Sequence, residues 1–307
     1  MRTIAVTPAI TKLCELCILG KLRAEIEELN LIHERQRGFV PSKSCDDNIA
    51  DLSEIIQKAK DAESIARRGR IPNWRRLKTY ILFVDLRKAF DMVQRPLLLQ
   101  KLRTKGVSEA LVQTLHSVRQ GTKADIDGEK IAMDIGVPQG AVLSPTLFAL
   151  YIDDLLTQLN EGTECYAFAD DLVIVAMGPV KLNLAIDKIE AWSAANGIAV
   201  NRAKSGVMQV RMDRRTPAPW EAQIRGFPVV KTYRYLGVLF DDSLSLEQEL
   251  KKKKELERSL RTQMQRMNYM QLEPAARYHV WQALMKSRLW YSIVLTSRIS
   301  PRVKTWM

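Results

Sequence analysis

Hydrophobic positions along this 307-residue chain follow two periods, one typical of helices and one typical of strands. Apolar residues at helical spacing predict helices over residues 9–32, 46–66, 95–104, 109–119, 146–160, 180–196, 247–267 and 274–295. Short apolar runs predict strands over residues 79–84, 165–169, 172–176, 206–212 and 232–240, and a hairpin near Asp127-Gly128. The chain is therefore expected to mix helices with strands, and the polar residues beside the strands need an explanation.

Asp170 and Asp171 lie between two apolar runs of five residues each. Both runs are typical of buried strands, so the acidic pair is expected at the tip of a hairpin. Two adjacent anions repel each other, and a pair held close to an apolar interior needs a compensating cation. The pattern predicts a divalent metal there, and an ordinary polar turn is the alternative.

A third carboxylate, Asp85, directly follows the predicted strand 79–84. Core packing does not require an acid at this position, whereas a site at the end of a sheet would place a metal ligand there; a simple strand-end cap is the alternative. The other adjacent aspartate pairs lack strand-favouring runs on both sides. They predict a helix start at Asp46-Asp47, a helix interior at Asp153-Asp154 and a polar turn at Asp241-Asp242.

Three further segments offer polar groups near the predicted strands. Residues 135–145 contain glycines and prolines that let the backbone approach a ligand, and Gln139 can hydrogen-bond without carrying charge. Loop 34–44 is basic and contains Gly, Pro and Ser, which suits a phosphate contact but also a plain surface loop. Lys204 is the one lysine between residues 188 and 231, so it is the candidate for any lysine role there.

Charge is unevenly distributed along the chain. Residues 1–200 contain 26 Lys or Arg and 26 Asp or Glu, whereas residues 201–307 contain 21 and 9, which accounts for the net charge of +12. An excess confined to one end indicates a surface for a polyanion, and a solvated basic helix is the alternative. Four scattered cysteines form no disulfide framework, which favours a reducing, intracellular compartment. No apolar run reaches the roughly 18 residues of a membrane helix, so no membrane partner is expected.

Six segments together resemble the reverse transcriptase domain of a non-LTR (LINE-type) retrotransposon. They are Arg37–Phe39 with Ser42–Ser44, Phe83–Asp91, Val137–Phe148, Phe168–Asp171, Gly197–Lys204 and Tyr235–Gly237. The resemblance covers nearly the whole chain in order and spacing. It implies an α+β right-hand polymerase fold, with partial fingers over residues 1–78, a palm with an antiparallel sheet and interleaved fingers elements over 79–240, and a basic helical thumb over 241–307. Arg2-Thr3-Ile4 stands where the family has Arg-Pro-Ile, so the N-terminal part of the fingers is expected to be lacking, or to be completed by a second chain.

The resemblance implies an RNA-directed DNA polymerase that extends a primer with deoxynucleotides by two-metal-ion phosphoryl transfer. Two Mg²⁺ ions are expected, with Mn²⁺ able to substitute, because Mg²⁺ prefers hard oxygen ligands. Asp85 and Asp170 are then bridging ligands, and Asp171 holds the primer-side ion or orients its shell. Lys204 becomes a general acid toward pyrophosphate, for which an exposed lysine without a role is the alternative.

The resemblance also implies contacts with the substrates. Phe90 would exclude a 2′-hydroxyl, and a core aromatic is the alternative. Tyr235, Leu236 and Gly237 resemble the family's primer-grip turn and would position the primer end, with a buried strand turn as the alternative. The other expected contacts are Gln139 and Gly140 with the nucleotide and the templating base, Arg37 and Lys43 with phosphates, and Lys251, Lys252, Lys253, Lys254, Arg258 and Arg261 with the duplex backbone.

The expected partners are an RNA template, a DNA or RNA primer, dNTPs and a ribonucleoprotein complex. A nuclear location is expected, with the mitochondrion as the alternative. Three other functions share parts of this pattern. They are a domesticated, non-catalytic RNA-binding subunit of a ribonucleoprotein, an intron maturase, and an RNA-dependent RNA polymerase, against which Phe90 argues.

Overall fold

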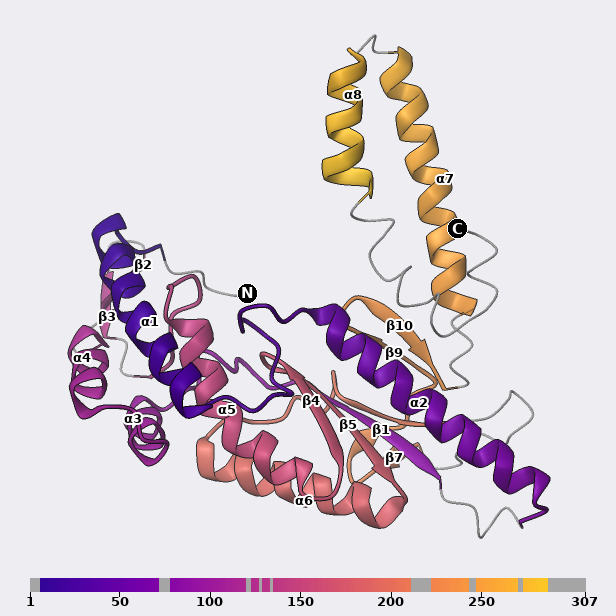
Figure 1. Cartoon of the computed structure of the whole chain (residues 1–307), viewed down its shortest axis with the longest axis horizontal. Coiled ribbons are helices and arrows are strands. Elements are labelled where there is room, and N and C mark those ends of the chain that lie inside the picture. The colour runs from indigo at the N-terminus through magenta and orange to yellow at the C-terminus, as the bar shows by residue number, and fades with distance from the viewer. Residues whose placement is uncertain are drawn as a thin grey trace. The chain divides into compact units, whose positions relative to one another are not determined.

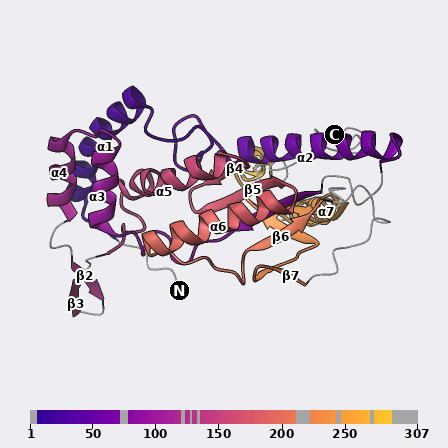
Figure 2. The same ribbon diagram turned by 90° about the horizontal axis from the view of Figure 1, so that it is seen from below.

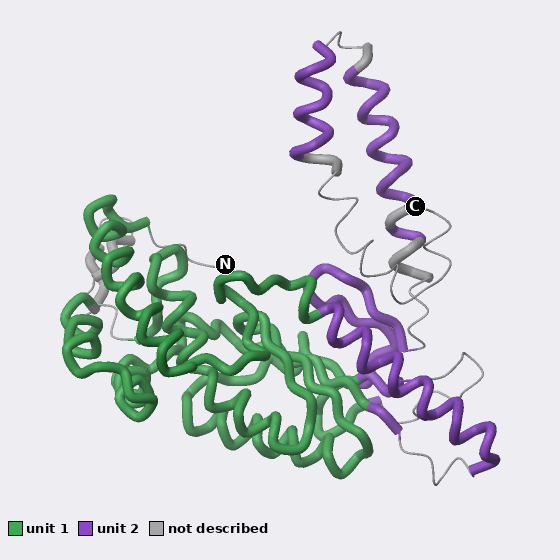
Figure 3. The backbone as a smooth tube through the Cα atoms, in the orientation of Figure 1, with its two compact units in different colours: residues 1–48, 80–207, 223–228 green, residues 49–79, 208–222, 229–307 purple. Residues whose placement is uncertain are grey.

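A computed structural model describes residues 6–71, 78–119, 123–126, 129–132, 135–210, 222–242, 247–269 and 273–286 (Figure 1). The chain divides into two compact units (Figure 3). Unit 1 comprises residues 1–48, 80–207 and 223–228, and unit 2 comprises residues 49–79, 208–222 and 229–307. The expected division at residues 78 and 240 stays a prediction.

Among its described residues, unit 1 contains the helices α1 (Ala9–Leu29), α3 (Arg95–Thr104), α4 (Glu109–Arg119), α5 (Ser144–Asn160) and α6 (Pro179–Asn196). A proline stands in the first turn of α3, α5 and α6, where its missing N–H group leaves no bond unmade. Helix α6 ends at Gly197, which adopts a left-handed φ of 68° that costs glycine little. These local signals explain why the helix bounds agree closely with the hydrophobic pattern.

A four-stranded sheet in the order β4-β5-β1-β6 supports the site. Its strands are β1 (Thr79–Val84), β4 (Glu164–Phe168), β5 (Asp171–Met177) and β6 (Gly206–Gln209), and the boundary between the two units falls within β1 and β6. All six residues of β1 are buried, which explains its uninterrupted apolar run. Helix α5 packs against β4, and α6 packs against β5 and against α5 (Figure 2).

Two short hairpins complete unit 1: β2 (Lys123–Ile126) with β3 (Glu129–Ala132), and β7 (Gln223–Ile224) with β8 (Phe227–Pro228). The first agrees with the hairpin predicted near residues 127 and 128, which themselves lie outside the described residues. The core of the unit gathers fully buried side chains from the sheet and from α5, among them Leu82, Phe148 and Ile174.

The pair Asp153-Asp154 lies inside α5, as predicted, and ties this helix to α3. Lys101 forms an ion pair with Asp154 at 2.7 Å and donates to the carbonyl of Tyr151 at 2.8 Å. Burial lowers the pKa of Lys101, while Asp154 opposes that shift. Asp153 is buried and pairs with Lys105. The carboxylates therefore hold two helices together, away from the pocket described below.

Unit 2 contains most of α2 (Cys45–Arg68), whose first turn carries Asp46 and Asp47 as predicted. It also contains the antiparallel hairpin of β9 (Thr232–Tyr235) and β10 (Val238–Asp241), then α7 (Glu247–Tyr269), α8 (Pro274–Val280) and a π-helical turn, Trp281–Lys286. The predicted helix 274–295 extends beyond the described residues, and so does the predicted strand 206–212. No helix in the described part of the chain is long and apolar enough to cross a membrane.

One prediction about residues 232–242 was wrong, and another was only partly met. The single strand over 232–240 is a hairpin, because Leu236 and Gly237 both adopt positive φ, at 44° and 82°, and reverse the chain. Of the turn expected at Asp241-Asp242, only Asp242 lies in a turn, since Asp241 ends β10, and both residues are buried. Burial lowers the pKa of Lys60, and the carboxylate of Asp241 opposes that shift. Lys60 therefore supplies a compensating positive charge near this buried acid.

Candidate active site

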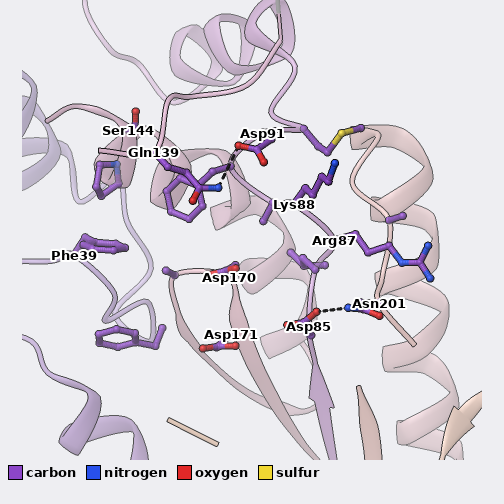
Figure 4. A pocket seen from close by; sticks show the side chains of 18 of the residues that line it. Phe39, Asp85, Arg87, Lys88, Asp91, Gln139, Ser144, Asp170, Asp171 and Asn201 are labelled. Atoms are coloured by element: carbon purple, nitrogen blue, oxygen red, sulfur yellow. Dashed lines mark hydrogen bonds between the residues drawn. The ribbon is translucent and has the colours of Figure 1, made fainter. Parts of the chain in front are cut away.

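A pocket of about 1200 Å³ opens in unit 1 (Figure 4). Five separate segments line it: Phe39, residues 85–92, residues 139–145, residues 168–171 and residues 197–204. Within these segments it brings together seven of the residues predicted from sequence: Asp85, Phe90, Gln139, Gly140, Asp170, Asp171 and Lys204. The fold therefore places side chains from distant parts of the sequence around one cavity.

The acidic pair owes its position to the turn between β4 and β5. Phe168 lies opposite Asp171 in the antiparallel register, so only Ala169 and Asp170 remain to reverse the chain. Ala169 adopts a φ of 58°, which is uncommon for a residue other than glycine. This tight turn places the carboxylates of Asp170 and Asp171 at the tip of the hairpin, on the pocket side (Figure 4).

Gln36 holds this turn from outside the hairpin. Its side-chain oxygen accepts hydrogen bonds from the N–H groups of Ala169 at 3.0 Å and Gly38 at 2.9 Å, and its amide nitrogen donates to the carbonyl of Ala169 at 3.4 Å. Gln36 is 1% exposed, and its backbone forms a parallel bridge with Ala167. The loop containing Gln36 is therefore a structural part of the site, a role that its basic composition did not reveal.

Gly38 explains how this loop comes so close. A Cβ atom at this position would lie 2.1 Å from the backbone nitrogen of Ala169, a distance that no side chain tolerates. The sequence shows the glycine, but it does not show that Ala169 lies against it in the folded chain.

Asp85 is held by the turn that follows α6. The side-chain amide of Asn201 donates to Oδ2 of Asp85 at 2.8 Å, and the backbone N–H of Asn201 donates to the Asp85 carbonyl, also at 2.8 Å. The N–H of Asp85 donates to the hydroxyl of Ser205 at 3.0 Å. The backbone and the carboxylate of Asp85 are thus both fixed by one distant segment, and its role as a metal ligand stays a prediction.

Gln139 also has a partner in the pocket. Its amide nitrogen donates to Oδ1 of Asp91 at 3.2 Å (Figure 4). The neighbouring Gly140 adopts a φ of 100°, a conformation that favours glycine. Asp91 therefore orients the amide that was predicted to contact the nucleotide, a role the sequence alone did not indicate.

Phe90 combines the two interpretations of it that the sequence allowed. Its ring stacks on Phe148 of the core, with centroids 4.5 Å apart and planes 20° apart, yet the residue also lines the pocket. Phe39 meets it edge-on at 6.4 Å and is 52% exposed. In the sequence Phe39 stands out only as part of a motif, whereas the structure places it in the pocket wall.

The remaining predicted contacts lie outside the pocket lining. Arg37 stacks its guanidinium over the Tyr166 ring at 5.8 Å, and Lys43 is exposed on the loop. Tyr235, Leu236 and Gly237 form the hairpin turn of unit 2. Lys251, Lys252, Lys254, Arg258 and Arg261 are exposed on α7, and the side chain of Lys253 is outside the described residues. Their roles toward nucleic acid stay predictions.

The pocket's donor set suits a hard divalent cation. Across the described residues, no three His, Cys, Asp or Glu side chains are grouped so that they could hold a metal ion by themselves. Mg²⁺ does not require such a cage, since it is commonly held by one or two carboxylates while substrate phosphates and water complete its octahedron. Asp85, Asp170 and Asp171 supply oxygen ligands of this kind around one cavity, so the residues fit the ion.

Comparisons with known proteins agree with this architecture. The RNA-directed DNA polymerase from the mobile element jockey of Drosophila funebris is 26% identical over 289 residues, which cover 88% of this chain and 29% of that protein. The Pol polyprotein of the type-2 retrotransposable element R2DM of Drosophila melanogaster is 26% identical over 230 residues, covering 67% of this chain and 20% of that protein. The chain thus spans less than a third of the length of these relatives.

The fold also has counterparts among solved structures. Telomerase from Candida tropicalis, in complex with a fragment of telomeric RNA, shares it with a TM-score of 0.50 at 12% identity, covering 77% of this chain and 37% of that chain. Residues 1–240 match the family described as reverse transcriptase (RNA-dependent DNA polymerase). Since that match includes every segment of the pocket, and the relatives are polymerases of non-LTR retrotransposons, the chain belongs to the reverse transcriptase family and represents a LINE-type domain.

Proposed function

We propose that this chain is the polymerase domain of an RNA-directed DNA polymerase, which extends a primer with deoxynucleotides on an RNA template. One observation carries the proposal: three carboxylates from two strand ends line the same pocket as Phe90, Gln139 and Lys204. The name of the jockey relative supports the reaction class, and the RNA-bound telomerase supports RNA as a binding partner.

Asp85, Asp170 and Asp171 would hold Mg²⁺ in this pocket. Two such ions, when bound, supply a lowered pKa at the attacking 3′-hydroxyl and neutralise charge on the phosphoryl oxygens. Asp85 follows β1, Asp170 lies in the β4–β5 turn and Asp171 begins β5, so the ligands would come from two separate segments of the chain.

The other residues of the pocket select and orient the nucleotide. The ring of Phe90 is backed by Phe148 and cannot easily retreat, so a sugar placed against it would have no room for a 2′-hydroxyl. Gln139, oriented by Asp91, would hydrogen-bond to the nucleotide or to the templating base. Lys204 would donate a proton to the departing pyrophosphate.

Primer extension by the purified chain on an RNA template tests the proposal. We expect incorporation of dNTPs in preference to NTPs, and we expect Asp170→Asn to abolish it because the substitution removes an anionic ligand. Asp61→Asn is the matched control, since Asp61 is exposed on α2 and accepts its hydrogen bond from Gln57, outside the pocket.

Three outcomes would contradict the proposal. A chain that binds RNA without incorporating nucleotides would indicate the non-catalytic RNA-binding function. A preference for NTPs would indicate an RNA polymerase. Equal activity in Asp170→Asn and the unsubstituted chain would show that the acidic turn is not the catalytic centre.

A further inference from the structure

We propose that Asn201 is a positioning residue, which orients the carboxylate of Asp85 for metal binding; this inference rests on the proposed function. The side-chain amide of Asn201 holds Oδ2 of Asp85 at 2.8 Å. One oxygen of the carboxylate is therefore tied down, and the rotation that would turn the group away from the cavity is restricted.

The contact is a two-point contact made by a single residue. The backbone N–H of Asn201 donates to the carbonyl of Asp85 at 2.8 Å, so the two backbones are held next to each other independently of the side-chain hydrogen bond. The pairing continues on both sides, since Arg87 donates its N–H to the carbonyl of Ala199 at 2.8 Å and Asp85 donates its own to the hydroxyl of Ser205 at 3.0 Å. These backbone hydrogen bonds therefore fix the Cα atom from which the side-chain amide of Asn201 extends toward Asp85.

The same turn carries Lys204. The carbonyl of Asn201 accepts hydrogen bonds from the N–H groups of Lys204 at 3.0 Å and Ser205 at 2.9 Å, and from the Ser205 hydroxyl at 2.9 Å. Asn201 therefore links the carboxylate of Asp85 to the backbone of Lys204, because its side chain bonds to the first and its carbonyl to the second.

The chemistry of the amide suits this task. A lysine or arginine in its place would neutralise Asp85 and compete with a cation for the carboxylate. An amide donates a hydrogen bond without charge, so the full negative charge of Asp85 stays available to the ion. Outer-shell partners of this kind typically change metal affinity by about 10–100-fold when they are removed.

Titration with Mn²⁺ alone, followed by electron paramagnetic resonance without nucleic acid, tests the inference. We expect Asn201→Ala to weaken Mn²⁺ binding by about tenfold or more, while the backbone bonds keep the turn folded. Asn183→Ala is the matched control, because Asn183 is exposed on α6 and lies outside the pocket lining. Asn201→Ser is the second variant: its hydroxyl is shorter than the amide, so it should lose the same contact if Asn201→Ala fails to fold.

A second readout separates positioning from a merely structural role. In primer extension, Asn201→Ala should raise the Mg²⁺ concentration for half-maximal rate by about tenfold, with the KM for the primer–template unchanged. Unchanged Mn²⁺ affinity in either folded variant would overturn the inference while leaving the proposed function intact. An unsubstituted chain that binds no Mn²⁺ and incorporates no nucleotide would overturn both.

Discussion

The side chain of Gln36 clamps the backbone of Ala169, although the two residues lie 133 positions apart in the chain. Ala169 is the residue that bends the β4–β5 hairpin before Asp170, so the clamp acts on the turn that presents the two carboxylates. A buried residue outside the pocket lining thereby fixes the turn that carries the proposed metal ligands.

Replacing Gln36 by Leu should destabilise unit 1. The substitution leaves the buried N–H groups of Ala169 and Gly38 without an acceptor, at a cost of about 1–3 kcal/mol in the free energy of unfolding. Urea denaturation measures that loss, and primer extension should slow as well. Gln57→Leu, at an exposed position of α2, is the control, and a Gln36→Leu protein as stable as this control would contradict the clamp.

A methyl group at position 38 should be poorly tolerated. The Cβ atom of Gly38→Ala would meet the backbone of Ala169 at 2.1 Å and that of Phe168 at 2.8 Å, so the loop and the hairpin must separate. We expect a loss of at least ~1–3 kcal/mol, the usual cost of overpacking, together with lower activity. The Cβ atom of Gly20→Ala would meet nothing within 4 Å at an exposed position of α1, so this variant should stabilise the chain by about 1 kcal/mol. Thermal unfolding of the two variants in parallel checks the opposite signs.

Shortening Phe90 should relax sugar selection. In Phe90→Val the side chain no longer fills the space in front of Phe148, so a 2′-hydroxyl finds room. The ratio of kcat/KM for NTPs to that for dNTPs should rise by ~10–200-fold, the range typical of one steric contact. Tyr278→Val, on α8 outside the pocket lining, should leave the ratio unchanged. A constant ratio in Phe90→Val would assign the ring to the core alone.

Tyr151 should make the stability of unit 1 sensitive to alkaline pH. Burial raises its pKa from 10.0 to about 12, and its hydroxyl donates to the carbonyl of Asn196 at 3.0 Å. A group with a raised pKa in the folded state binds its proton more tightly there, so its contribution is complete below pH 10.0 and is lost as the pH rises toward about 12.

Urea denaturation as a function of pH should show that the free energy of unfolding of the unsubstituted chain falls over this range. It should fall less steeply in Tyr151→Phe, because phenylalanine has no ionisable hydroxyl. At neutral pH the free energy of unfolding of Tyr151→Phe should be lower by about 1 kcal/mol, which is the usual contribution of one hydrogen bond. Parallel pH profiles for the two proteins would contradict the assignment.

Much of the secondary structure follows from local pattern. The apolar run 79–84 coincides with β1, and the helix predicted over 95–104 coincides with α3. Both signals, an uninterrupted apolar run and a proline in the first helical turn, can be read from a few neighbouring residues. The apolar pattern alone missed the hairpin at residues 232–241, because its apolar residues run straight through the turn; a turn at Tyr235–Gly237 was implied only by the resemblance. Its one local signal was Gly237, which allows the positive φ that the turn needs.

The sequence by itself determined which acids stand out, since Asp85, Asp170 and Asp171 interrupt apolar strands where packing has no use for charge. Only the tertiary structure decided which side chains hold them. Gln36 reaches Ala169 and Asn201 reaches Asp85 across 133 and 116 positions. A polar residue in a loop has the same local pattern whether it faces water or satisfies a distant backbone group, so its partner is defined only once the chain has folded.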